Sequence, residues 1–187
     1  MSTVDPTAAE VAARLPGDDL VPDANVVMDR AMTLPAPPAQ VWPWLVQLGK
    51  RRAGWYMSRR VERFIPRSRR AVRTIEARWQ GLAVGDVIPD WGGKTAEFVV
   101  AVIDTERCLV HRSTRGHSQL SWALVLKPVA GGQTRLQLRL RLGGVERVRL
   151  AGIVGGGFDE ATIILLRAGL AERLQTPTGE DPPATNG

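Results

Sequence analysis

Residues 41–56 read VWPWLVQLGKRRAGWY and contain three of the six tryptophans and the only tyrosine of the 187-residue chain. Apolar side chains recur here with the i, i+3, i+4, i+7 spacing of one helical face, at Val41, Trp44, Leu45 and Leu48. The prolines of residues 35–38 suit the first turn of a helix, where amides lack partners. Gly49 suits the left-handed residue that ends one. We therefore predict a helix that starts near residue 39 and leads into a turn.

Strands are predicted on both sides of this helix. The expected ranges are residues 26–34, 86–89, 96–103, 108–114, 119–127 and 134–142, separated by residues typical of turns. The last range alternates most cleanly, with leucines at every second position and Arg135, Gln137, Arg139 and Arg141 between them. This pattern predicts one buried and one solvent-exposed face. The short connections after residue 86 predict an antiparallel meander.

The remaining segments divide the chain into one domain with two tails. Residues 55–66 are predicted to form a short helix, and residues 148–157 a glycine-rich connection. A largely buried helix should run from about residue 158 to 174, because its middle is apolar almost all round. We expect a flexible arm over residues 1–25, a single domain over 26–175 and a disordered tail over 176–187. The fold class is α+β.

Composition excludes several classes of protein. A single cysteine rules out an intramolecular disulfide framework, and no secretory signal or spanning apolar segment is apparent. We expect a soluble cytoplasmic protein. The net charge is +6, and residues 50–78 hold eleven basic residues against two acidic ones. Such a region attracts nucleic acid, anionic lipid or acidic ligands without selecting among them. The arginines expected to face solvent are Arg59, Arg60, Arg63, Arg67, Arg69 and Arg70.

The chain resembles a known superfamily at several positions. Residues 35–49, PAPPAQVWPWLVQLG, look like the first helix of SRPBCC proteins, the START-like superfamily. Gly54-Trp-Tyr56, Gly85-Asp86, Trp122 and Thr134-Arg-Leu136 resemble a bacterial branch of it. That superfamily includes polyketide cyclase/dehydratase-like proteins, lipid-transfer domains and the major birch pollen allergen. The resemblance implies a helix-grip fold, in which a curved antiparallel sheet wraps around a long C-terminal helix and encloses an apolar cavity. It implies no single activity.

Two sets of side chains are candidates for a site in such a cavity. Five aromatic residues are candidate ligand contacts: Trp44, Trp55, Tyr56, Trp91 and Trp122. Each of them is also suited to ordinary core packing, and Trp91, in a turn, is a candidate for the cavity mouth. Four residues are weaker candidates for acid–base catalysis: Glu62, Asp86, His111 and Asp159. Their alternative roles are a surface ion pair for Glu62, a turn for Asp86 and a helix start for Asp159.

Metal and cofactor chemistry receive little support from the sequence. The soft ligands are Cys108, His111 and His117, and a closed zinc site needs four donors. Cys108 and His111 lie three apart in a predicted strand and should face opposite sides. No phosphate loop or nucleophile elbow occurs, so we predict no cofactor. The leading hypothesis is binding of a small or medium-sized hydrophobic molecule. The alternatives are a cyclase or dehydratase-type enzyme, and a protein that binds anionic surfaces through residues 50–78.

Overall fold

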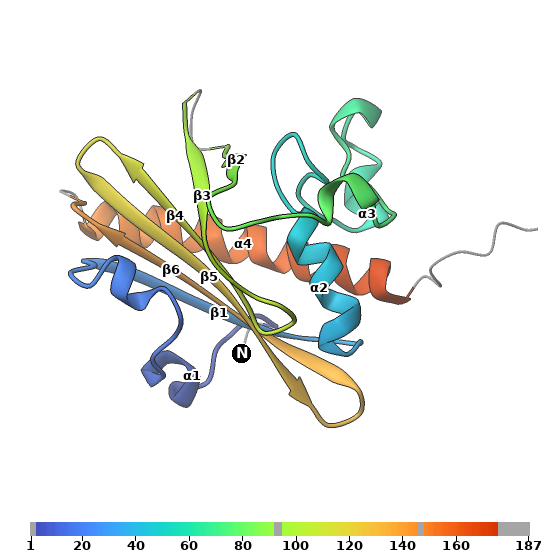
Figure 1. Cartoon of the computed structure of the whole chain (residues 1–187), viewed down its shortest axis with the longest axis horizontal. Helices are drawn as coiled ribbons and strands as arrows, with labels where there is room; N and C mark the ends of the chain where they lie inside the picture. Colours follow the sequence, from blue (N-terminus) through green and yellow to red (C-terminus); the bar gives the residue numbers. More distant parts are fainter. Residues whose placement is uncertain (1–2, 92–94, 146–147, 176–187) are drawn as a thin grey trace, which may run out of the picture.

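The computed structural model describes residues 3–91, 95–145 and 148–175, and the backbone alone over residues 148–159. Within these residues, six antiparallel strands form one sheet in the order β1-β6-β5-β4-β3-β2 (Figure 1). The strands are β1 (Val26–Leu34), β2 (Val87–Pro89), β3 (Glu97–Asp104), β4 (Cys108–Arg115), β5 (Ser118–Val129) and β6 (Gln133–Gly143). The first strand of the domain therefore pairs with the last, and the others follow as a meander.

Helices lie beside this sheet, and they include the two longer helices that the sequence predicts, α2 and α4. The α-helices are α1 (Ala8–Ala12), α2 (Pro38–Gln47), α3 (Arg59–Glu62) and α4 (Val148–Gln175), and three short 3-10 turns are η1 (Asp18–Leu20), η2 (Arg67–Arg69) and η3 (Ala77–Trp79). Figure 1 shows α4 running along one side of the sheet, with α2 near its C-terminal half. Contacts join α4 to β1 and to α2. The α+β class and the helix-grip arrangement are confirmed.

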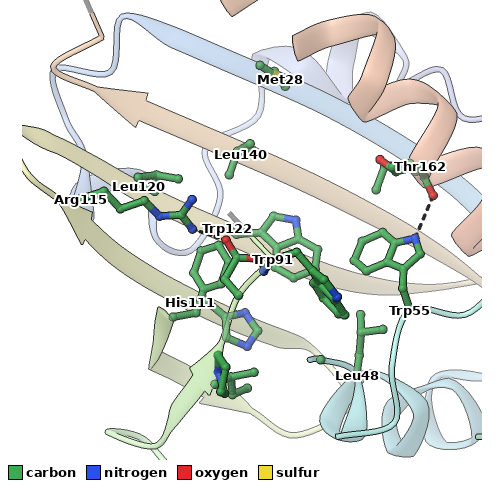
Figure 2. A pocket seen from close by; sticks show the side chains of 16 residues that line it. Met28, Leu48, Trp55, Trp91, His111, Arg115, Leu120, Trp122, Leu140 and Thr162 are labelled. Carbon is green, nitrogen blue, oxygen red and sulfur yellow. Dashed lines mark hydrogen bonds and ion pairs between the residues drawn. The ribbon is translucent and has the colours of Figure 1, made fainter. Parts of the chain in front are cut away.

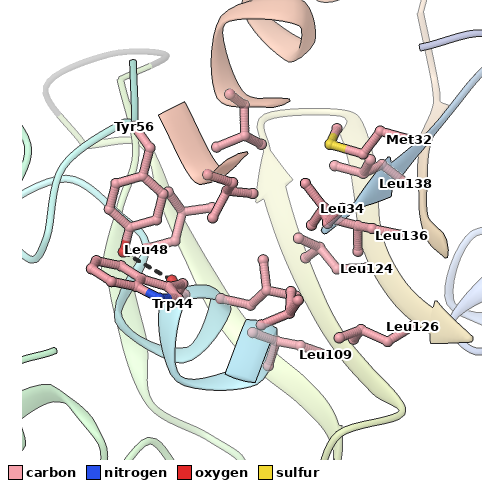
Figure 3. Close-up of a cluster of buried hydrophobic side chains, with 14 of the residues drawn as sticks. Met32, Leu34, Trp44, Leu48, Tyr56, Leu109, Leu124, Leu126, Leu136 and Leu138 are labelled. Atoms are coloured by element: carbon pink, nitrogen blue, oxygen red, sulfur yellow. Dashed lines mark hydrogen bonds between the residues drawn. The ribbon is translucent and has the colours of Figure 1, made fainter. Parts of the chain in front are cut away.

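The main core lies between α4, α2 and the inner face of the sheet (Figure 3). Strand β6 contributes two of the leucines that its alternation predicts to be buried, Leu136 and Leu138, both at most 2% exposed. From α4, Leu166 and Leu170 are fully buried in the same cluster. Burial of a leucine contributes about 2 kcal/mol, so this cluster is the main stabilising element of the fold.

The outer face of the sheet is covered by the N-terminal arm. Leu15 packs there against Val110 and Val125 in a second apolar cluster. Val4 is fully buried, and its carbonyl accepts a hydrogen bond from the amide of Ala31 in the edge strand β1, at 3.0 Å. The arm that we expected over residues 1–25 thus contributes to both clusters over its described part, residues 3–25.

The prediction that one face of residues 134–142 is exposed to solvent is wrong, because the N-terminal arm covers that face. Arg135 forms an ion pair with Glu10 at 2.8 Å, and this guanidinium lowers the pKa of the Glu10 carboxyl to about 2. Arg139 is 4% exposed and pairs with Asp18 at 3.0 Å and Asp29 at 2.7 Å. The alternation was read correctly, but its polar face binds the arm rather than water.

The expected strand bounds agree with the structure to within two residues, whereas those of the helices differ more. Residues 26–34 are β1, and the strand predicted over 134–142 extends by one residue at each end. The helix predicted within residues 55–66 is only one turn long. The predicted connection over residues 148–157 is wrong, because α4 begins at Val148. A glycine inside a helix costs only about 1 kcal/mol, so the glycines of residues 155–157 weaken the helix without ending it. The predicted tail, residues 176–187, lies outside the described residues.

Candidate functional site

A pocket of about 320 Å³ lies between the inner face of the sheet and α4 (Figure 2). All six strands contribute to its lining, with Met28 from β1 and Leu140 from β6 at one end. Thr162 and Ile163 of α4 form part of the opposite wall, and Trp55 closes the side toward α2. The indole Nε1 of Trp55 donates a hydrogen bond to the carbonyl oxygen of Thr162 at 3.2 Å. This bond fixes the tryptophan against the helix.

Aromatic rings form a continuous wall of this pocket. Trp55 is stacked near Trp122, with ring centroids 6.1 Å apart and planes inclined by 24°. Trp91 meets Trp55 edge to face at 6.0 Å, and residue Trp91 is 51% exposed. The ring centroid of Phe98 lies 6.0 Å from that of Trp122. These separations are typical of favourable aromatic pairs, so the rings hold one another in place.

His111 is the buried polar group of the wall. Antiparallel register places it directly opposite Trp122, and the two rings stack with centroids 5.6 Å apart. The histidine is 5% exposed, and within the described residues its Nδ1 has no hydrogen-bond partner. Burial is the main cause that lowers the pKa of His111 to about 4. A hydrogen bond to the Trp122 backbone raises this pKa, and the positive charge of Arg52 lowers it. The imidazole is therefore neutral at pH 7.

One ion pair supplies the charged groups of the described lining. The guanidinium of Arg115 binds the carboxylate of Asp90, and it also lies 5.3 Å from the centre of the Phe98 ring. The ammonium of Lys50 donates to the carbonyl of Asp90 at 2.6 Å. The positive and negative charges of the Arg115–Asp90 pair balance each other, so the pair adds polarity to the pocket without a net charge.

Three of the five predicted aromatic ligand contacts line the pocket, namely Trp55, Trp91 and Trp122. The other two belong to the core (Figure 3). Trp44 is 6% exposed and meets Tyr56 edge to face at 5.6 Å, and the Tyr56 hydroxyl donates to the Trp44 carbonyl at 2.9 Å. Burial raises the pKa of Tyr56, so the phenol stays neutral. Its role here is structural.

Two of the three predicted carboxylates, Glu62 and Asp86, lie away from the described pocket lining. Glu62 is 4% exposed and pairs with Arg73 at 2.7 Å and Arg173 at 2.9 Å, so its ion pair is buried rather than on the surface. Asp86 is exposed and accepts a hydrogen bond from the amide of Ala83 at 2.9 Å, which makes it a turn residue. Asp159 lies in α4, and its side chain is outside the described residues. Of the four acid–base candidates, the structure brings His111 to the pocket.

The basic segment forms a separate surface around α3 and η2. All six predicted arginines are exposed, as expected: Arg59, Arg60, Arg63, Arg67, Arg69 and Arg70. Phe64 stands among them with 77% of its surface exposed, and the Arg63 guanidinium lies 4.6 Å from the centre of its ring. Arg70 donates to the carbonyl of Ile65 at 2.8 Å and so holds the turn closed. The result is an exposed aromatic ring surrounded by positive charge.

Three further features bear on the predicted chemistry. In the described part of the chain, no three histidine, cysteine or acidic side chains are grouped as metal ligands. Cys108 belongs to the outer cluster while His111 faces inward, so the predicted opposite orientation is confirmed. Burial raises the pKa of the Cys108 thiol, which keeps it unreactive.

None of the helices described is both long enough and apolar enough to cross a membrane.

Several lining residues escaped the sequence analysis. Phe98 was not singled out within its predicted strand, and Arg115 and Asp90 were assigned to turns. The alternation of β3 places Phe98 and Val100 on one face, but a bulge between Val100 and Val102 interrupts the pattern. That irregularity hides which face Phe98 occupies, and the pairing of Arg115 with Asp90 across 25 residues is not a local signal.

Comparisons with known proteins give the following likenesses. No protein-family model matches the chain, and no curated protein is significantly similar in sequence. Among solved structures, the chain is similar to protein MLL2253 from Mesorhizobium loti, with 14% identity and a TM-score of 0.49 over 80% of this chain and 96% of that one. The chain is also similar to CalU16 from Micromonospora echinospora, with 17% identity and a TM-score of 0.49; the match covers 80% of this chain and 84% of CalU16.

A third solved structure is a Polyketide_cyc-like protein from Corynebacterium glutamicum, with 16% identity and a TM-score of 0.45 over 80% and 93% of the two chains. Each of these three structures aligns with 80% of this chain. The order of strands and the long C-terminal helix described above are those of the helix-grip fold that the sequence resemblance predicts.

Proposed function

We propose that this protein binds a small hydrophobic molecule in the pocket between the sheet and α4, and that it holds this molecule without transforming it. The observation that carries the proposal is the wall of adjoining rings around a space of about 320 Å³. Ligand pockets combine apolar walls with a few polar groups, and their volumes start near ~300 Å³. An aromatic wall of this kind stabilises an apolar ligand by removing it from water.

The polar groups support binding better than catalysis. Glu62 and Asp86 are engaged in an ion pair and a turn outside the described lining, so neither supplies a proton there. His111 is present, but a general base works best with a pKa near the operating pH, and that of His111 is held at about 4. An acid–base reaction would therefore rest on one poorly matched group.

Binding of the neutral, polarity-sensitive dye prodan tests this proposal. We expect the dye fluorescence to shift to the blue and saturate with the wild-type protein. Leu120→Trp enlarges a pocket-lining side chain of β5 and should abolish the shift. Val129→Trp makes a comparable change at an exposed position of the same strand and should not. Thermal unfolding checks that both variants fold, and equal dye binding by the two would reject the pocket as the site.

A second function is supported by the surface around Phe64. We infer that this surface binds membranes rich in anionic lipid, because an exposed ring among arginines can enter the headgroup layer while the arginines meet the phosphates. Nucleic acid would require a groove or a row of stacking rings, whereas one exposed ring, Phe64, is seen within the described residues 59–70.

Sedimentation with vesicles tests this second function. Vesicles of phosphatidylcholine with phosphatidylserine should carry the protein down, vesicles of phosphatidylcholine alone should not, and salt should weaken the binding. Phe64→Ser and Arg63→Glu should each reduce it, and Arg107→Glu, at an exposed arginine elsewhere, is the control. Binding to single-stranded nucleic acid but not to the anionic vesicles would overturn the assignment.

A further inference from the structure

Among the described lining residues of the pocket, one buried polar atom has no hydrogen-bond partner, and this atom indicates what kind of ligand fits there. The Nδ1 atom of His111 has no hydrogen-bond partner in the described structure, although the residue is only 5% exposed. Leaving a buried polar atom without a hydrogen bond destabilises a protein by about one to three times as much as a typical hydrogen bond stabilises it. Native proteins therefore rarely contain such an atom without a reason. Because His111 lines the pocket, a ligand there is in a position to satisfy it.

The shape of the wall defines the form of that ligand. Trp55 and Trp122 are inclined by only 24°, and His111 stacks on Trp122 with planes inclined by 28°. Neighbouring ring faces in similar orientations favour a flat partner, because a flat ring gains stacking contacts that a branched chain does not. Figure 2 shows these rings from β4, β5 and the segment before α3 gathered around the same space.

The charges of the wall restrict the ligand further. Arg115 and Asp90 neutralise each other, and they are the charged side chains of the described lining. A charged ligand would lose its hydration without gaining an unengaged counter-charge from these groups. A hydroxyl group, by contrast, both donates and accepts, so it pairs with Nδ1 whichever nitrogen of the neutral imidazole bears the proton.

We propose, resting on the function given above, that the pocket selects a neutral planar aromatic molecule with a hydroxyl group, and that this hydroxyl forms a hydrogen bond with Nδ1 of His111. His111 then determines specificity, while the indole rings supply the general affinity for apolar molecules. The burial that keeps the imidazole neutral also strengthens a hydrogen bond made there.

Three naphthalene probes test this proposal by equilibrium dialysis at pH 7: naphthalene, 2-naphthol and 2-naphthoate. The wild-type protein should bind 2-naphthol about three- to tenfold more tightly than naphthalene, the effect of one net hydrogen bond. The anionic 2-naphthoate should bind most weakly. In His111→Phe, which keeps a ring but removes both nitrogens, the preference for naphthol should vanish. In His111→Gln, whose amide still donates and accepts, part of it should return.

The readout is the ratio of the two dissociation constants, so a general loss of affinity in a variant cancels. Equal binding of naphthol and naphthalene by the wild type would overturn the proposal, as would a preference that persists in His111→Phe. Either result leaves the proposed function standing. If the wild type binds none of the three probes, the proposed function fails together with the inference.

Discussion

The buried imidazole of His111 should make the stability of this protein depend on pH in a defined window. The folded protein holds the pKa of His111 at about 4, against about 6.5 in an unfolded chain. Above about pH 7.5 the imidazole is almost entirely neutral in both states and contributes little pH dependence. Between pH 6.5 and 4 the unfolded chain binds a proton that the folded chain does not, so the free energy of unfolding falls as the pH falls.

The size of this effect follows from the two pKa values. The two pKa values differ by about 2.5, and a pKa difference of 1 corresponds to about 1.4 kcal/mol, so protonation of His111 should contribute a loss of about 3 kcal/mol by pH 4. The variant His111→Phe has no group to protonate at this position. Between pH 7.5 and pH 4 its free energy of unfolding should therefore fall by about 3 kcal/mol less than that of the wild type. It should also equal or exceed the wild type in stability at pH 7.5, because it removes an unpaired buried nitrogen.

Urea unfolding at pH 7.5, 6, 5 and 4 measures this difference for each protein. The Glu10 carboxyl, whose pKa is lowered to about 2, contributes stability that is lost only as the pH falls below about 4.5. Its window overlaps little with that of His111, and it is the same in both proteins. The variant His117→Gln controls for the loss of an exposed imidazole. Parallel curves for wild type and His111→Phe would refute the reasoning, because His111 would then titrate normally.

Three further predictions concern the frame that holds the pocket. Glu62→Gln should lower the free energy of unfolding by about 3–5 kcal/mol, measured by urea unfolding, because it leaves the fully buried guanidinium of Arg173 without its carboxylate. Gly169→Ala should destabilise by about 1–3 kcal/mol in the same assay, although alanine favours helices, because its Cβ would overlap backbone atoms of Tyr56. Arg139→Ala should make the N-terminal arm sensitive to limited proteolysis, since this side chain binds three carbonyls of the arm at 2.7–3.2 Å.

Matched variants show whether these effects are specific. Glu97→Gln removes an exposed carboxylate and should change the free energy of unfolding by less than ~0.5 kcal/mol. Gly81→Ala adds a methyl group where no atom lies within 4 Å. Arg112→Ala removes an exposed arginine of β4 and should leave cleavage of the arm slow. If any of these controls behaved like its partner variant, the corresponding contact would not be the cause.

Local patterns in the sequence predicted the sheet well, because each strand has its own alternation. They did not predict what covers each face. Arg139 sits on the polar side of a regular strand, and that side is the same whether water or the N-terminal arm lies against it. Only the fold shows that the arm binds there. The glycines of residues 155–157 misled in the opposite direction, since a weak local preference gave way to a continuous helix.

The sequence predicted that the site would be aromatic and apolar, but it did not predict correctly which residues line it. Trp44 and Trp122 both sit in regular elements with apolar neighbours, yet one packs in the core and the other lines the pocket. The difference depends on where α2 crosses the sheet, which is a property of the whole fold. Glu62 pairs with Arg173 across 111 residues, so no local pattern distinguishes it from a catalytic carboxylate. His111 was a candidate for its residue type alone.

The exit of α2 couples the pocket to the frame. Along residues 55–57, Trp55 faces the pocket and donates to the Thr162 carbonyl, while Tyr56 faces the core, where Arg173 lies 4.6 Å from the centre of its ring. The carbonyl of Met57 then accepts from Arg173 at 3.0 Å. The wall of the pocket is thus attached to α4 at three successive residues. A ligand that needs more room must separate Trp55 from α4 and disturb a buried guanidinium, so the pocket should select by size as well as by chemistry.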